Sequence, residues 1–110
     1  MSKKLIVKRR GKVYAVPLEK IILMEKSLRK ISIHTTLGMF DFYGKFKEII
    51  PSLDERFLCC HRSYIINMDE IVAMNYKEIC FTNGKRIYFG RDKCRKALEI
   101  FGEYISKKIL

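Results

Sequence analysis

The chain has 110 residues, of which 48% are hydrophobic, enough for one domain with its own core and too many for a disordered segment. Its 23 lysines and arginines outnumber its 12 acidic residues, which gives a net charge of +11. So much charge on one small domain favours a polyanionic partner, nucleic acid first and an anionic membrane surface second. The alternative is a protein with a basic surface and no anionic partner.

Other classes of protein are excluded by what the sequence lacks. No apolar run approaches the roughly 20 residues that span a bilayer, and the apolar run of residues 5–7 is too short for a secretory signal. Cys59, Cys60, Cys80 and Cys94 include an adjacent pair and no Cys-x-x-Cys, which suits neither a disulfide framework nor a zinc site. We therefore expect a cytoplasmic domain over residues 1–110, with reduced thiols, no metal, no cofactor and no receiver domain.

Apolar periodicity in the first half of the chain predicts five strands and one short helix. Residues 5–8 and 13–16 flank a basic, glycine-containing turn and form a hairpin. Residues 21–24 form a strand that a charged group at 25–30 interrupts. Residues 31–36 alternate with period two, as in a half-buried strand, and residues 39–43 follow as another. Residues 44–53 have helical spacing, but Pro51 makes that helix short or irregular.

The second half of the chain predicts further strands and a closing helix. Residues 57–67 form two strands that turn at His61-Arg62-Ser63, and residues 71–74 and 79–82 form two more. Asn83-Gly84 is a strong hairpin signal, with residues 86–89 as the returning strand. Residues 93–108 predict a helix whose apolar face packs on the sheets or serves self-association; we expect packing.

The motif His61-Arg62-Ser63-Tyr64-Ile65-Ile66-Asn67, with Asn83-Gly84-Lys85-Arg86-Ile87-Tyr88 and then Arg91, resembles the LytTR DNA-binding domain. This family supplies output domains of LytR- and accessory-gene-regulator-type bacterial response regulators. The resemblance covers residues 5–96. It implies a mainly β fold, in which short antiparallel strands form a layered sandwich of small sheets, with one short internal helix and a C-terminal helix.

The same resemblance implies sequence-specific binding of double-stranded DNA in bacterial transcription regulation. Loop side chains would read bases in two successive major grooves, at paired direct-repeat sites where a second copy can bind alongside. The implied base-reading positions are Arg62, Arg91 and one position in the loop of residues 26–30, where Arg29 and Lys30 are candidates beside Ser27. Arginine suits this task because it contacts guanine O6 and N7 together. The expected backbone contacts come from Ser27, Ser63, Lys45, Lys77, Lys85 and Lys93.

Simpler roles exist for the same residues. Cys59-Cys60-His61 with Asp69 suggests a nucleophile and its base, but a strand flanked by apolar residues should bury one thiol, so we expect no enzyme. His61 and Asn67 should hold local backbone by hydrogen bonds. Arg62 and Arg91 could form surface ion pairs with Asp69 or Asp92.

Two other functions fit a small basic β-domain. One is binding of single-stranded nucleic acid or RNA without sequence preference, by stacking on exposed aromatic residues. The other is binding of an acidic protein. A preference for duplex DNA of one sequence over a scrambled one distinguishes our expectation from both. We expect neither a membrane nor a small-molecule substrate as partner.

Overall fold

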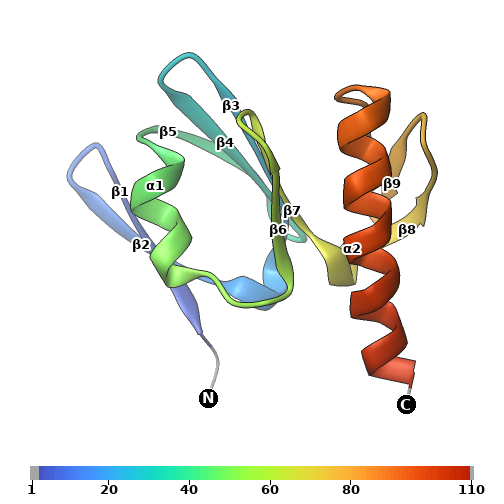
Figure 1. Ribbon diagram of the computed structural model, residues 1–110. Helices are drawn as coiled ribbons and strands as arrows, with labels where there is room; N and C mark the ends of the chain where they lie inside the picture. Colours follow the sequence, from blue (N-terminus) through green and yellow to red (C-terminus); the bar gives the residue numbers. More distant parts are fainter. Residues whose placement is uncertain (1–2, 110) are drawn as a thin grey trace.

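Ten short strands in the computed structural model, which describes residues 3–109, form three separate antiparallel sheets (Figure 1). The central sheet has the order β5-β4-β3-β7-β6, with bounds β3 (Ile21–Ser27), β4 (Lys30–Thr35), β5 (Gly38–Tyr43), β6 (Phe57–His61) and β7 (Tyr64–Asn67). The hairpin of β1 (Lys4–Arg9) and β2 (Lys12–Pro17) is the second sheet. The third, ordered β10-β9-β8, consists of β8 (Ile71–Met74), β9 (Ile79–Phe81) and β10 (Arg86–Ile87).

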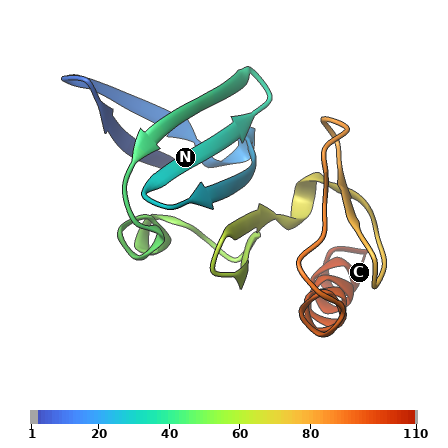
Figure 2. The same ribbon diagram turned by 90° about the horizontal axis from the view of Figure 1, so that it is seen from above.

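Two helices complete the domain. The short α1 (Phe46–Ile49) runs into a 3-10 turn (Ile50–Ser52) at Pro51, as the sequence predicted. The long α2 (Arg91–Ile109) packs through Cys94 and Ala97, both buried, and stands beside β8 and β9 (Figure 2). The expected layered, mainly β architecture is therefore confirmed. None of the helices in the described part of the chain is both long and apolar enough to cross a membrane.

The central strand β3 faces two apolar cores. Ile21 and Met24 pack with the β1–β2 hairpin and α1, whereas Ile22 and Leu23 pack with the third sheet. Two adjacent residues reach the same core because the register between β3 and β4 shifts between Ile21 and Leu23, as at a β-bulge. A strand buried on both faces explains the unbroken apolar run of residues 21–24.

Asn67 is the only buried polar residue within residues 3–109, at 1% exposure. Its Nδ2 donates a hydrogen bond to the carbonyl of Ile21 at 2.7 Å, and its Oδ1 accepts one from the amide of Asp69 at 2.9 Å. Both polar atoms of the amide are thereby satisfied, which removes the cost of burying them. The expected structural role of Asn67 is confirmed: it joins the end of β7 to the start of β3.

Among the predicted boundaries that were wrong, three lie close to the expected DNA-binding residues. Strand β3 continues three residues beyond Met24, because Glu25, Lys26 and Ser27 pair with β4. Strand β10 ends two residues before Phe89. Helix α2 begins two residues before Lys93, so Arg91 lies on its first turn rather than in a loop. Gly90, with φ +104, ends the extended segment, and its carbonyl accepts a hydrogen bond from the amide of Cys94.

Candidate nucleic-acid interface

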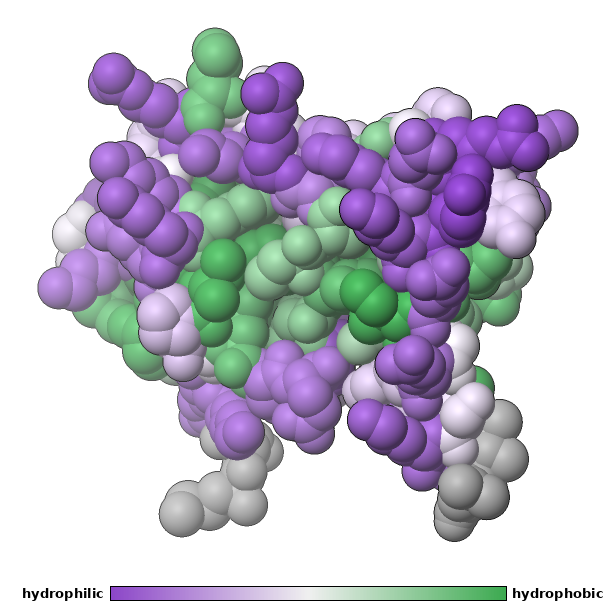
Figure 3. Space-filling view, in the orientation of Figure 1, coloured by the Kyte–Doolittle hydropathy of each residue, from purple (hydrophilic) through white to green (hydrophobic). Residues whose placement is uncertain are grey.

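Several loop tips lie along one edge of the molecule, opposite the two termini. Figure 1 shows the β3–β4 turn, the β6–β7 turn and the start of α2 along its upper edge, with the β1–β2 turn to one side. Figure 3 shows mostly hydrophilic side chains along this edge, with one apolar side chain projecting from it, and apolar side chains below it. We call this upper rim, with the β1–β2 turn, the basic edge, because its turns carry Arg9-Arg10, Arg29-Lys30, Arg62 and Arg91.

An open hollow of about 730 Å³ brings three segments of the basic edge together. Lys26 and Ser27 come from the end of β3, and Ser63 from the β6–β7 turn. The segment of residues 88–90 before α2 forms the third wall. Arg62 and Arg91 each directly neighbour a lining residue. The segments that the sequence motif singled out are therefore adjacent in space.

Two hydrogen bonds fix the conformation of the β6–β7 turn, which carries Arg62. The amide of Ser63 donates a hydrogen bond to His61 Nδ1 at 3.0 Å, and the carbonyl of Ser63 accepts one from the amide of Lys26 at 2.9 Å. Only a neutral imidazole can accept at Nδ1. Desolvation, together with the positive charges of Lys93 and Arg62, lowers the pKa of His61 and favours that neutral form. The predicted structural role of His61 is confirmed.

Three aromatic rings join this turn to the segment that leads into α2. The ring centroid of His61 lies 5.6 Å from that of Tyr64 and 5.5 Å from that of Phe89, and the last two are 5.8 Å apart. Such distances are typical of attractive aromatic pairs. The cluster thus fixes the position of the Arg62 turn relative to the start of α2.

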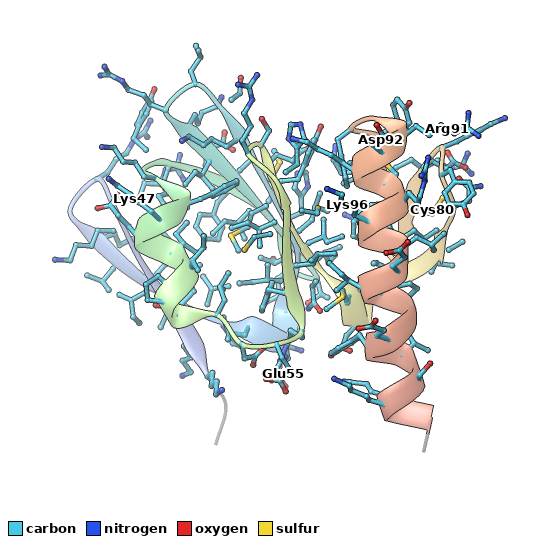
Figure 4. The ribbon with its side chains drawn as sticks, in the orientation of Figure 1. Lys47, Glu55, Cys80, Arg91, Asp92 and Lys96 are labelled. Atoms are coloured by element: carbon cyan, nitrogen blue, oxygen red, sulfur yellow. The ribbon has the colours of Figure 1, made fainter. Side chains whose placement is uncertain are left out.

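Of the expected base readers, the three arginines are exposed and available. Within residues 3–109, Arg62, Arg91 and Arg29 form no recorded ion pair with a carboxylate. Figure 4 shows Arg91 projecting outward from the first turn of α2.

The acidic groups proposed as partners for these arginines are occupied elsewhere. Asp69 accepts hydrogen bonds from Tyr104 at 2.7 Å and from Lys108 at 2.9 Å, and Asp92 pairs with Arg95 at 3.4 Å. Contacts with Tyr104 and Asp69 raise the pKa of Lys108 to about 12. The structure therefore does not support the ion-pair interpretation of Arg62 and Arg91.

Two of the lysines that were expected to contact DNA form ion pairs with acidic side chains. Lys30 lies 3.7 Å from Asp41, and the Lys85 ammonium lies 3.2 Å from Glu25 Oε1. The other oxygen of Glu25 is 2.9 Å from His34 Nε2. Because Glu25 lines the hollow, its carboxylate would repel a phosphate, and Lys85 offsets that charge. Lys85 therefore reduces the negative potential that Glu25 creates in the hollow. Lys45, Lys77 and Lys93 are exposed.

The sequence reasoning missed two features of the basic edge. A second hollow of about 310 Å³ lies between the β1–β2 turn, the start of β4 and the end of β5. Its wall contains four cations, Lys8, Arg9, Arg10 and Lys30, and one acid, Asp41. The signal for it was the run Lys8-Arg9-Arg10 beside Gly11. The other missed feature is Leu28, which is 92% exposed at the tip of the β3–β4 turn. Only its place as the single apolar residue in the run of residues 25–30 hinted at it.

Neither Cys59 nor Cys60 has the lowered pKa of a reactive thiol. Cys59 is exposed and Cys60 is partly buried against the core, as strand alternation predicted, and all four thiols are free. Burial raises the pKa of Cys59, and it raises the pKa of Cys60 to about 12, so neither is a thiolate at neutral pH. No group of three or more potential metal ligands lies within the described residues.

Comparison with known proteins identifies the family. The family model described as the LytTr DNA-binding domain matches residues 11–102. The chain belongs to the LytTR family of DNA-binding domains. This LytTR domain is 33% identical over 86 residues to accessory gene regulator protein A of Staphylococcus epidermidis and 30% identical to that of Staphylococcus aureus. Each alignment covers 74% of this chain but 36% of the relative, so the chain spans little more than a third of those proteins.

The fold is also shared with a solved LytTR domain. That structure is the LytTr DNA-binding domain of a Bacillus cereus protein described as a methyl-accepting/DNA response regulator. The two superpose with a TM-score of 0.76 over 93% of this chain and 99% of the other, at 19% identity. The family is one of DNA-binding domains, not of enzymes.

Proposed function

We propose that this LytTR domain binds double-stranded DNA sequence-specifically and acts in bacterial transcription regulation. One observation carries the proposal: Arg62 and Arg91, exposed and free of recorded carboxylate partners, flank one hollow and are fixed relative to each other by the aromatic cluster. A guanidinium held in this way can form two hydrogen bonds to guanine O6 and N7, worth about 1–3 kcal/mol of discrimination. Reading a base sequence requires that the reading side chains be held in a fixed geometry, whereas non-specific binding does not.

The dimensions of the domain suit contact with two grooves. Its longest principal extent is 40 Å, and one turn of B-DNA is about 34–36 Å long. The domain is therefore large enough for loop tips to reach successive major grooves of one duplex. Two copies on paired direct repeats would extend this arrangement along the DNA.

The third reading position lies in the β3–β4 turn. Arg29 is exposed and has no recorded acidic partner among the described residues, whereas Lys30 is paired with Asp41. We therefore favour Arg29 over Lys30 as the polar base contact.

Other exposed cations would hold phosphates. Lys45, Lys77 and Lys93, with the hydroxyls of Ser27 and Ser63, are the proposed contacts, and we add Arg9 and Arg10 of the second hollow. Each neutralised phosphate contributes about −0.9 to the slope of log affinity against log salt. Such contacts position the protein without reading sequence.

The test is a selection from a random duplex pool with the purified domain. We expect enrichment of a short motif, and competition for it by its own duplex but neither by a scrambled duplex nor by either single strand. Equal competition by all duplexes would overturn sequence-specific reading. Stronger competition by the single strands would favour the single-strand binder instead.

A further inference from the structure

We propose that Leu28 is a specificity-determining residue that contacts the 5-methyl group of a thymine. The proposal rests on the proposed function, since it needs the β3–β4 turn to face duplex DNA. It assigns an apolar contact to a turn whose other proposed DNA contacts, Ser27 and Arg29, are polar.

Leu28 occupies a position that folding does not explain. At 92% exposure it is the most exposed large apolar residue within residues 3–108. Its neighbours Ser27 and Arg29 are exposed as well. A leucine that buries almost nothing adds no hydrophobic stabilisation to the folded state.

The backbone at Leu28 is also unfavourable for leucine. Its φ is +57, and Arg10 is the only other non-glycine residue with positive φ in the described part of the chain. Leu28 is the first of two turn residues between β3 and β4, a position where such hairpins prefer Asn, Asp or Gly. Bulky side chains at positive φ are strained, and strain of this kind clusters at functional sites. Two independent features, exposure and strain, thus point to a role outside the fold.

The turn presents Leu28 on a rigid support between the two hollows. Ser27 and Lys30 pair across the hairpin, and the carbonyl of Arg29 accepts a hydrogen bond from the amide of Gly44 at 3.1 Å. Ser27 lines the larger hollow and Lys30 the smaller. A duplex lying along the basic edge would therefore pass the exposed side chain of Leu28.

The chemistry of the major groove limits what Leu28 can recognise there. Thymine is the only base that presents a methyl group in this groove, and apolar side chains recognise it by contact. Leucine has no donor or acceptor with which to read the other bases. Insertion between base pairs from the minor groove, or contact with a protein, would use the same exposure but would not depend on the thymine methyl.

The test uses the duplex selected by the wild-type domain. Each thymine is replaced in turn by uracil, which removes only the 5-methyl group. We expect one position where the replacement weakens wild-type binding about four-fold, the value of one buried methyl. In Leu28→Ala, affinity for the thymine duplex should fall by roughly ten-fold or less, and the uracil effect at that position should vanish.

Three further variants control for the fold and for general apolar effects. Leu28→Asn tolerates the positive φ, so it should melt no lower than wild type and yet lose the uracil effect. Leu28→Met should retain it. Leu37→Ala removes a leucine that is 87% exposed at the other end of β4, and it should bind like wild type.

The outcomes separate this inference from the proposed function. A wild-type domain that selects a motif but shows no thymine-methyl dependence, or the same dependence in Leu28→Ala, overturns the Leu28 contact alone. If Leu28→Ala bound all duplexes equally more weakly than wild type, and the uracil effect persisted, Leu28 would act by insertion between base pairs. That result would also overturn the thymine-methyl contact. No selected motif at all overturns both.

Discussion

The rings of His61 and Phe89 lie 5.5 Å apart, although one belongs to the central sheet and the other follows the last strand of the third. Arg62 comes directly after the first ring, and Arg91 two residues after the second. The spacing between these two arginines therefore depends on an apolar contact rather than on a charge. Reading two bases at once requires that this spacing be fixed.

Replacement of Phe89 tests this coupling. Phe89→Ala leaves the net charge unchanged but removes one corner of the aromatic cluster. We expect affinity for the selected duplex to fall by about ten-fold or more, with general binding at low salt unchanged. Fluorescence anisotropy on selected and scrambled duplexes measures both. Equal affinity of the variant and wild type for the selected duplex would show that the ring contact does not position the arginines.

The two arginines themselves should govern preference and not stability. Arg62→Ala or Arg91→Ala should each reduce discrimination between selected and scrambled duplexes by about 1–3 kcal/mol, that is, roughly 5- to 150-fold. Melting temperatures should be unchanged, because neither side chain has a recorded ion pair within residues 3–109. Arg95→Ala is the matched control, since it removes the same charge one turn along α2. An unfolded variant would show that its arginine is structural.

Sequence patterns predicted most strands because alternation and turn residues follow from local physics. Residues 25–27 were misassigned because strand pairing with β4 outweighs their polar composition, which a local pattern does not register. The role of Lys85 was equally hidden, since its partner Glu25 is far away in the chain. Leu28 was missed because exposure and a positive φ are properties of the folded turn.

The β1–β2 turn should contribute affinity without preference. In Arg9→Ala/Arg10→Asn, asparagine tolerates the positive φ of +51 at position 10, so the turn is preserved. The slope of log affinity against log salt should become about 1.8 units shallower, with discrimination between duplexes unchanged. The control Lys4→Ala/Lys20→Ala removes two charges from the far end of the hairpin. It should change neither the salt slope nor the discrimination between duplexes. Identical slopes for both double variants would exclude the second hollow from the interface.

Acid should destabilise the domain through His61. Its pKa is lowered in the folded state by desolvation and by the charges of Lys93 and Arg62, so the unfolded chain binds the proton more tightly. The contribution of His61 to stability is therefore complete above its ordinary pKa of 6.5 and is lost as the pH falls below that value towards the folded pKa. Carboxylates such as Asp69, whose pKa is lowered from 3.8, lose their contribution only in stronger acid.

Titration of the His61 ring by NMR, with melting curves over the same pH range, measures this effect. Lys93→Ala should raise the pKa of His61, because it removes a nearby positive charge. His61→Asn should make the melting temperature less dependent on pH below 6.5. The turn is preserved, because an asparagine Oδ1 can accept a hydrogen bond from the amide two residues on, as Asn67, Asn75 and Asn83 do here. Its loss of ring contacts should lower stability equally at every pH. A His61 midpoint at or above the ordinary value would show that the turn does not require the neutral ring.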